Sequence, residues 1–215
     1  MPKPTLTRGR PRQFDRDVAL QRAMEVFWAR GYEATQVSDL LAALAMSPPS
    51  FYAAFHSKEA VYREAIDLYL SSVGGRGMKA LQEIPDVRAA LKAMLEAAIE
   101  VALASGSAGG CMVSLGLIHP QAQNAGLRDH LRDLRRTTSL MICDRLKRGV
   151  ADGELPPGLD PEEMARFVAT VLHGLSLQAQ DGASAEELTA VAIRALSVLP
   201  RNPDDVSSDE PGLSA

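Results

Sequence analysis

The stretch from residue 37 to residue 55, VSDLLAALAMSPPSFYAAF, most constrains what this chain can fold into. Its first half has apolar residues at helical spacing, which predicts a short helix with one apolar face. These residues are Val37, Leu40, Leu41 and Leu44. Ser47 and the two prolines after it predict a second helix start, because a hydroxyl caps free N–H groups and proline needs no partner in a first turn. Two short helices joined by a tight corner form a helix-turn-helix, whose second helix enters the DNA major groove. An ordinary helical hairpin is the alternative.

Charge is spread unevenly along the 215 residues, so the net charge of −4 does not exclude a nucleic-acid partner. Residues 1–12 hold four basic side chains and no acid, and we expect residues 1–13 to be a flexible basic arm. Its arginines, in RGRPR, are candidates for contacts in a minor groove, with a merely solubilising segment as the alternative. They are Arg8, Arg10 and Arg12. Residues 200–215 are polar and rich in acidic side chains, and we expect them to form an acidic mobile tail.

Hydrophobic residues make up 46% of the chain, with few aromatic or β-branched runs, which favours an all-α fold of about nine helices. Residues 14–72 are expected to form a three-helix DNA-binding domain and the start of a connecting helix. Residues 73–199 are expected to form a helical ligand-binding and dimerisation domain, with a flexible joint over 74–85. In that second domain the pattern predicts helices near 87–104, 111–118, 127–152, 160–179 and 184–199.

The segment GRPRQFDRDVALQRAMEVFWARGYEATQVSDLLAALAMSPPSFYAAFHSKEAVYREAIDLY resembles the N-terminal DNA-binding domain of the TetR/AcrR family of transcriptional repressors. The resemblance covers about residues 8–69 and depends on the order and spacing of GYEAT, FYAAF and SKEAVY. One departure is Ala45, where the family usually has a turn glycine; we expect its φ to stay negative. The other is Pro49 beside Pro48, which removes base-reading donors and favours contacts with thymine methyl groups.

The resemblance implies two groups of DNA contacts. The group expected at base edges comprises Ser47, Pro48, Pro49 and Ser50, and the group expected to hold phosphates comprises Thr35, Tyr52, His56 and Lys58. Lys58 lies at a predicted helix start, where free N–H groups also attract phosphate. Thr35 is also expected to cap the helix after it. A core tyrosine and a loop histidine are the alternatives for Tyr52 and His56.

Cys111 is a possible redox sensor. It follows two glycines at the start of the helix expected over 111–118, where the helix dipole would lower the thiol pKa. Some regulators of the resembled family with a similar GGC segment respond to electrophiles or oxidants. The alternative is a small buried residue. Neither cysteine belongs to a metal-binding pattern, and we predict no metal, no cofactor and no catalytic residue.

The sequence therefore predicts a DNA-binding transcriptional regulator rather than an enzyme. In its most concrete form this is a homodimeric repressor, paired through the helices near 160–179 and 184–199, on a palindromic operator. Release would follow binding of an unknown small-molecule inducer or modification of the thiol. No apolar run is long enough for a membrane helix and no secretory signal is present, so we expect no membrane partner and a cytoplasmic location. The alternative is a helical small-molecule carrier or enzyme whose hairpin serves only packing.

Overall fold

A computed structural model describes residues 15–104, 110–118 and 121–200. Within these ranges the regular structure consists of nine α-helices and one short 3₁₀ helix, which confirms the all-α fold. The helices are α1 (Arg16–Ala34), α2 (Val37–Leu44), α3 (Pro48–Phe55), α4 (Lys58–Ser71), α5 (Arg76–Glu83), α6 (Val87–Ala104), η2 (Ala122–Asn124), α7 (Ala125–Ala151), α8 (Pro161–Gln180) and α9 (Ala185–Ser197). The basic arm with Arg8, Arg10 and Arg12, and the tail from residue 201, lie outside the described residues.

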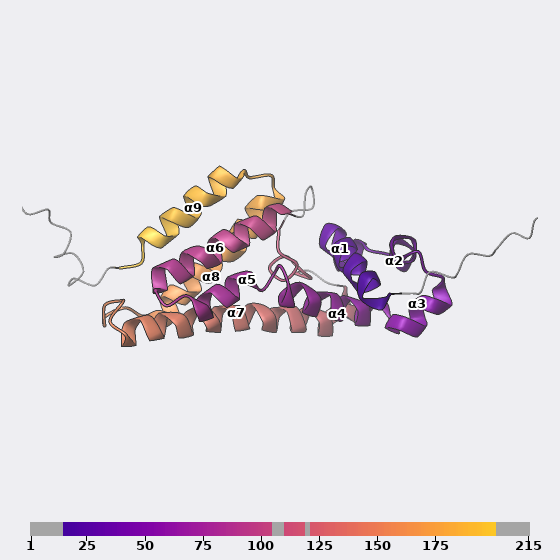
Figure 1. The fold of residues 1–215 in the computed structure, drawn as a ribbon, viewed down its shortest axis with the longest axis horizontal. Coiled ribbons are helices and arrows are strands. Elements are labelled where there is room, and N and C mark those ends of the chain that lie inside the picture. The colour runs from indigo at the N-terminus through magenta and orange to yellow at the C-terminus, as the bar shows by residue number, and fades with distance from the viewer. Residues whose placement is uncertain (1–14, 105–109, 119–120, 201–215) are drawn as a thin grey trace, which may run out of the picture.

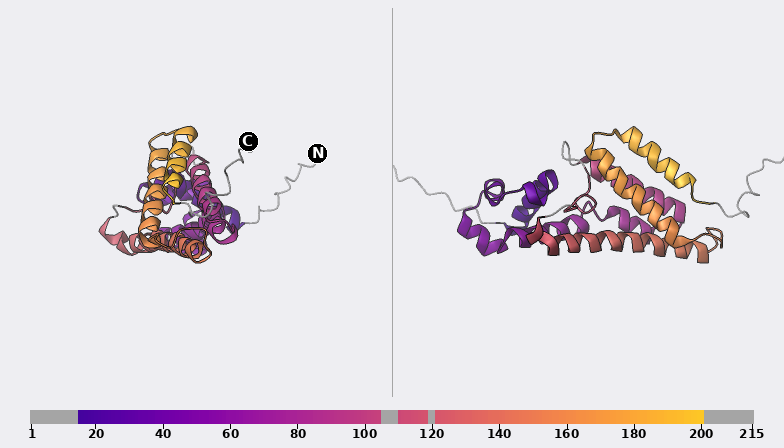
Figure 2. Two further views of the ribbon diagram at one scale, coloured as in Figure 1. Left: turned by 90° about the vertical axis from the view of Figure 1, so that its left-hand side faces the viewer. Right: turned by 180° about the vertical axis from the view of Figure 1, so that it is seen from behind.

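The helices form an elongated molecule with α1, α2 and α3 at one end (Figure 1). Helices α6, α8 and α9 pack together at the other end, and α7 runs along one side beside α5. The view from behind shows the same division (Figure 2). Two hydrophobic cores correspond to these ends. One gathers buried side chains of α1–α4, including Phe27, Phe51 and Ile66, and the other those of α5–α9, including Leu91 and Leu172.

Side-chain caps start α1, α3, α4 and α9 where the sequence predicts them. The Asp15 carboxylate accepts hydrogen bonds from the backbone N–H groups of residues 17 and 18 at the start of α1. Ser47 and Ser57 cap α3 and α4 in the same way. At α9, Ser184 and Glu187 form the reciprocal capping box. Ser47 therefore fixes the start of α3, the helix expected to contact DNA, and Ser57 fixes the start of the next helix.

Thr35 corrects one of these expectations. Its side chain is fully buried, and its hydroxyl donates a 2.7 Å hydrogen bond to the carbonyl of Gly31. Gly31 itself has φ +74°, which interrupts α1 near the predicted helix end at residue 30. The cap of α2 is instead Gln36, in a capping box with Asp39. The prediction that Thr35 caps α2 is therefore wrong, because its hydroxyl already serves the kink in α1.

The corner between α2 and α3 also differs from expectation. Ala45 has φ +53° and ψ +42°, the left-handed region, whereas we expected a negative φ. Its N–H donates to the carbonyls of the preceding turn, and Met46 N–H donates to Leu41 O at 3.0 Å. These bonds close the end of α2 in the way that usually requires glycine. The chain accepts the strain of an alanine there.

We expect Ala45→Gly to raise the free energy of unfolding by about 0.5–1 kcal/mol, because relief of the left-handed strain exceeds the entropy that glycine adds to the unfolded chain. Chemical denaturation would measure the change. Ala42→Gly is the matched control, since Ala42 is exposed inside α2 and has helical geometry. There the same substitution should lower the free energy of unfolding. Equal losses from both variants would contradict the strain at Ala45.

The stretch expected to be a flexible joint, residues 74–85, contains helix α5. Its N-cap residue, Gly75, has no side chain that could cap the helix, so the start of α5 has no such signal in the sequence. Gly77 is buried where α5 meets α6. A Cβ at that position would lie 3.1 Å from the Met94 carbonyl oxygen, so glycine permits this close approach. The glycines that suggested a joint here instead serve packing.

The helix expected over 111–118 is absent; residues 110–118 form turns, and we call them the turn segment. Gly110 has φ +95° and Leu117 has φ +51°, which no continuous helix accommodates. The guanidinium of Arg135 on α7 donates to the carbonyls of Val113, at 2.7 Å, and Gly116, at 3.2 Å. Because these carbonyls accept hydrogen bonds from α7, they do not need the i→i+4 backbone hydrogen bonds of a helix. Cys111 therefore does not lie at a helix N-terminus.

Candidate nucleic-acid interface

The two faces of α3 differ sharply in burial. Phe51 and Phe55 are fully buried in the core of α1–α4. The side chains at residues 48–50, 52 and 53 are exposed, and Tyr52 keeps 48% of its surface accessible. Because Phe51 and Phe55 are four residues apart, they lie on one face of α3, which packs on the core, and the opposite face is exposed to solvent. Helix α3 itself lies at the end of the molecule away from α9 (Figure 1).

The four residues expected at base edges lie together at the exposed start of α3. Ser47 and Ser50 have their hydroxyl oxygens 2.9 Å apart, and Ser47 Oγ accepts from the Ser50 N–H. Pro48 and Pro49 occupy the first turn between them. This end therefore presents two hydroxyls and two apolar rings, with few N–H donors. Such a surface is suited to hydroxyl contacts and to the thymine methyl group in a major groove.

Three of the four residues expected to hold phosphates lie on α3 or just after it. Tyr52 and His56 are exposed, and His56 ends α3 with φ +63°. Lys58 begins α4, and its ammonium nitrogen lies 4.1 Å from the centroid of the Tyr32 ring. Burial lowers the pKa of Lys58, and the carboxylates of Glu33 and Asp39 oppose that shift. Thr35 is buried, so we leave it out of the proposed phosphate contacts.

Arg16 is a positioning residue that sequence reasoning missed. Its guanidinium donates to the Ala54 carbonyl at the end of α3 and pairs with Glu64 of α4 at 2.7 Å. It also lies 4.9 Å from the Phe55 ring centroid. One side chain of α1 thus fixes α3 against α4. No spacing rule reveals it, because its partners are 38 and 48 residues away.

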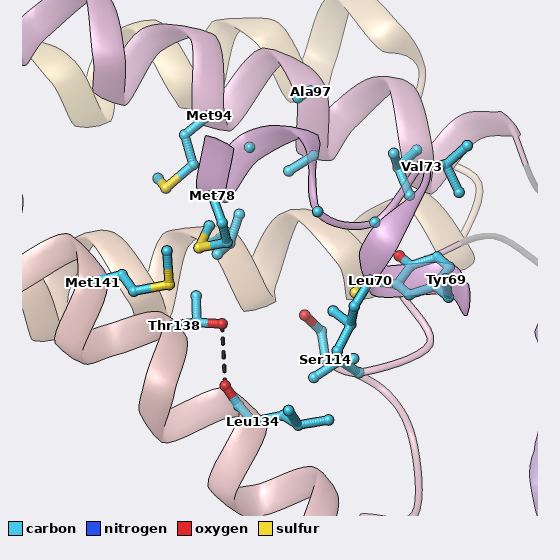
Figure 3. Close-up of a pocket in the computed structure, with 18 of the residues that line it drawn as sticks. Tyr69, Leu70, Val73, Met78, Met94, Ala97, Ser114, Leu134, Thr138 and Met141 are labelled. Carbon is cyan, nitrogen blue, oxygen red and sulfur yellow. Dashed lines mark hydrogen bonds between the residues drawn. The ribbon is translucent and has the colours of Figure 1, made fainter. Parts of the chain in front are cut away.

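A second site lies in the other half of the molecule, where α4–α8 and the turn segment enclose a cavity of about 330 Å³ (Figure 3). Most of its lining is apolar, with Leu70, Met78 and Met141 among the side chains that face it. Cys111 is half-buried at its wall. A cavity of this size with a few polar groups is typical of a small-molecule site.

Helix α1 is bonded to the turn segment, which borders this cavity, and to the residues that follow that segment. The indole N–H of Trp28 donates to the Gly110 carbonyl at 2.8 Å. The Glu33 carboxylate accepts from the Gln121 N–H and from the side-chain amide of Asn124, both at 2.9 Å. The segment that borders the cavity is therefore bonded directly to the domain that carries α3. A change in the cavity has a short physical route to the helix-turn-helix.

The three-helix arrangement and the exposed α3 define a DNA-binding protein of the helix-turn-helix class. Residues 19–65 match the family described as bacterial regulatory proteins of the tetR family, and residues 88–195 match the tetracyclin repressor-like C-terminal domain. The chain belongs to the TetR family of transcriptional regulators. This membership confirms the resemblance seen in the sequence and makes the chain a DNA-binding regulator rather than an enzyme. The carrier or enzyme alternative is set aside on the same ground.

Individual relatives agree with this assignment. The transcriptional repressor ComR of Escherichia coli K12 is 32% identical over 199 residues, which span 90% of this chain and 93% of ComR. The repressor BdcR of the same organism is 29% identical over 193 residues, 87% of this chain and 90% of BdcR. A solved structure of the TetR family regulator CifR, a cysteine mutant complexed with 26-bp double-strand operator DNA, is 42% identical. It has a TM-score of 0.83 and covers 89% of this chain and all of the CifR chain.

No helix in the described ranges is long and apolar enough to cross a membrane. Within the same ranges, His, Cys, Asp and Glu side chains form no group of three or more that could hold a metal ion.

Proposed function

We propose that this chain is a homodimeric repressor that acts in the cytoplasm on a palindromic operator. The exposed start of α3, with its opposite face buried, carries the proposal. Each protomer would place Ser47, Pro48, Pro49 and Ser50 against base edges, and two protomers would reach successive major grooves. Tyr52, His56 and Lys58 would hold phosphates and so set the register. The basic arm would add Arg8, Arg10 and Arg12 in the minor groove.

Exposed apolar side chains on α8 and α9 support the dimer. Phe167 and Leu177 on α8 are 38% and 47% exposed, on the side of the helix opposite the buried Leu172. Val191 and Ile193 on α9 are 49% and 61% exposed. Large apolar side chains that are exposed on two neighbouring helices favour an isologous four-helix interface between two copies.

Release from the operator would follow occupation of the cavity. A ligand that fits the cavity better in one spacing of the two α3 helices shifts the dimer toward that spacing. The bonds from Trp28 to Gly110 and from Glu33 to η2 would transmit the shift to α1. Modification of Cys111 is the second route, because this side chain lies between the cavity and a pocket bordered by the end of α1.

Selection of random DNA duplexes on the purified protein tests the proposal, with the molar mass in solution measured alongside. Recovery of a palindrome by a species of twice the chain mass would support it. Recovery of no preferred sequence, or of a single half-site by a monomer, would contradict it. The palindrome then supplies the duplex for the measurements below.

We expect Lys58→Ala to weaken binding to the operator and to random DNA by about the same factor. The factor should be the same because a phosphate contact carries no sequence information. The variant should also reduce the slope of log affinity against log salt by about 1, because one fewer phosphate is neutralised and one fewer counterion is released. Ser50→Ala is the matched comparison, since a base-edge contact should change the order of preferred sequences and leave the salt slope unchanged. Fluorescence anisotropy at several salt concentrations measures both. An unchanged salt slope in Lys58→Ala would remove Lys58 from the phosphate contacts.

We expect Cys111→Ser to abolish the release of the operator by hydrogen peroxide, which oxidises a single thiol to a sulfenic acid with loss of water, while basal affinity stays the same. Cys143→Ser is the control, because Cys143 is buried between α7 and its neighbours and should leave oxidant release intact. Operator affinity with and without the oxidant is the measurement. Release that persists in Cys111→Ser would exclude this thiol as the sensor.

A further inference from the structure

The hydroxyl of Tyr69 is a polar group left over in the cavity. Tyr69 lies on α4, its side chain is fully buried, and it lines the cavity. Its oxygen has no hydrogen-bond partner of good geometry among the described residues, although the Cys111 thiol and the Met112 N–H lie close enough to influence the pKa of the hydroxyl. Figure 3 shows this oxygen turned toward the side chains that line the cavity. A buried hydroxyl without a partner costs free energy, so its persistence indicates a group that completes it when bound.

The ring that carries this hydroxyl packs against Trp28 and Gly74. Trp28 meets it edge to face with the ring centroids 5.3 Å apart. Gly74 also lies against the ring, where a Cβ would fall 2.1 Å from a Tyr69 ring carbon. Glycine at this position therefore makes room for the tyrosine. A fixed ring presents its hydroxyl to a ligand without further ordering.

Two other hydroxyl groups of the cavity already have partners. Ser114 Oγ lies 3.0 Å from His173 Nδ1. Thr138 donates to the Leu134 carbonyl at 3.2 Å (Figure 3). Burial, and then the charge of Arg135, lowers the pKa of His173, so its imidazole is neutral at pH 7. Burial raises the pKa of Tyr69, which keeps its hydroxyl protonated as a donor.

The lining offers no counterion inside the cavity. Among the lining residues that the structure describes, the charged one is Lys79, whose side chain is 70% exposed and pairs with Glu83. Three methionines, Met78, Met94 and Met141, adapt readily to apolar shapes. An ion would lose its hydration here without a partner in return, which is unfavourable.

We propose that the cavity binds a neutral, largely apolar molecule that carries one hydrogen-bond-accepting oxygen, of the ketone type, and that Tyr69 Oη donates to that oxygen. The proposal rests on the effector role given to this cavity above and names the chemistry that it selects. Tyr69 is the specificity-determining residue. Its contact with Trp28 of α1 places the recognised oxygen one side chain away from the DNA-binding domain.

Three probes of similar shape test the proposal by calorimetry on the full chain: benzophenone, diphenylmethane and diphenylacetate. The ketone should bind about tenfold more tightly than the hydrocarbon, and the anion should bind weakest. Tyr69→Phe should remove the preference for the ketone and leave affinity for diphenylmethane unchanged. Thr138→Val is the matched control, because it deletes a cavity hydroxyl that already has a partner, and it should retain the preference.

Thermal unfolding of the ligand-free protein provides a second measurement. Tyr69→Phe should raise the melting temperature, since it deletes a buried hydroxyl without a partner. A lowered melting temperature, equal affinity for ketone and hydrocarbon, tighter binding of the anion, or no measurable ketone binding would each overturn the proposal. Operator release is measured in a separate assay. If the ketone binds but does not release the operator, the proposed effector role of the cavity fails, whereas the calorimetry alone decides which class of ligand the cavity binds.

Discussion

Replacing Arg145 with alanine is expected to lower the free energy of unfolding by about 3 kcal/mol. Arg145 of α7 is 3% exposed. Its guanidinium donates to the Pro85 carbonyl and pairs with the Glu154 carboxylate at 3.1 Å. Glu154 in turn accepts from the backbone N–H of Val87, at the start of α6. One cation therefore holds together the beginning of α6, the end of α7 and the loop after it.

The loss should be large because alanine leaves the Glu154 carboxylate only partly exposed and without its cation. Chemical denaturation measures it. Arg136→Ala on the same helix is the control, since that side chain is 69% exposed and its pairing with Asp133 is weak, at 3.6 Å. The control should change the free energy of unfolding by less than about 0.5 kcal/mol. A similarly small loss in Arg145→Ala would show that the three-way contact contributes little.

The second large effect is expected on DNA affinity, from the triple variant Arg8→Ala, Arg10→Ala and Arg12→Ala. Removing three cations from the arm should weaken operator binding on the order of 100-fold at low salt and reduce the salt slope by about 3. The reason is the counterion release that each arginine produces in a narrow minor groove. Fluorescence anisotropy with the selected palindrome at several salt concentrations measures both quantities.

A charge-matched control separates this effect from a change in net charge. Lys92, Arg136 and Lys147 are exposed on α6 and α7, and their triple alanine variant removes the same three charges away from α3. That variant should retain most of the affinity and the salt slope. Equal losses in the two triple variants would mean that the arm acts only through overall charge and makes no local contact.

Much of the fold could be predicted because its signals are local. The start of α1 has its cap at Asp15, α3 has Ser47 followed by two prolines, and α9 has the capping box of Ser184. The exposed face of α3 follows from the spacing of Phe51 and Phe55. Residues 87–104 form α6 with the predicted limits, because apolar periodicity over five turns is a strong signal.

The expectations that failed depend on contacts between distant residues. The turn segment was expected to be helical from its composition, but Arg135 from α7 takes up its carbonyls. The glycines before and within α5 suggested a joint, whereas Gly77 serves the approach to Met94. Thr35 lies in a sequence that favours a helix cap, and burial against the kink at Gly31 decides otherwise. Spacing along the chain contains none of this information.

The core of α1–α4 extends beyond the predicted domain limit at residue 72. Val101 of α6, Met112 and Leu117 of the turn segment, and Leu127 and Leu131 of α7 belong to the same buried cluster as Phe27 and Ile66. A hybrid regulator made by grafting residues 1–72 onto another effector domain would strip these side chains from the core and expose apolar surface. The sensing half and the DNA-reading half of this protein are therefore not interchangeable modules, and recombination must carry the whole shared core.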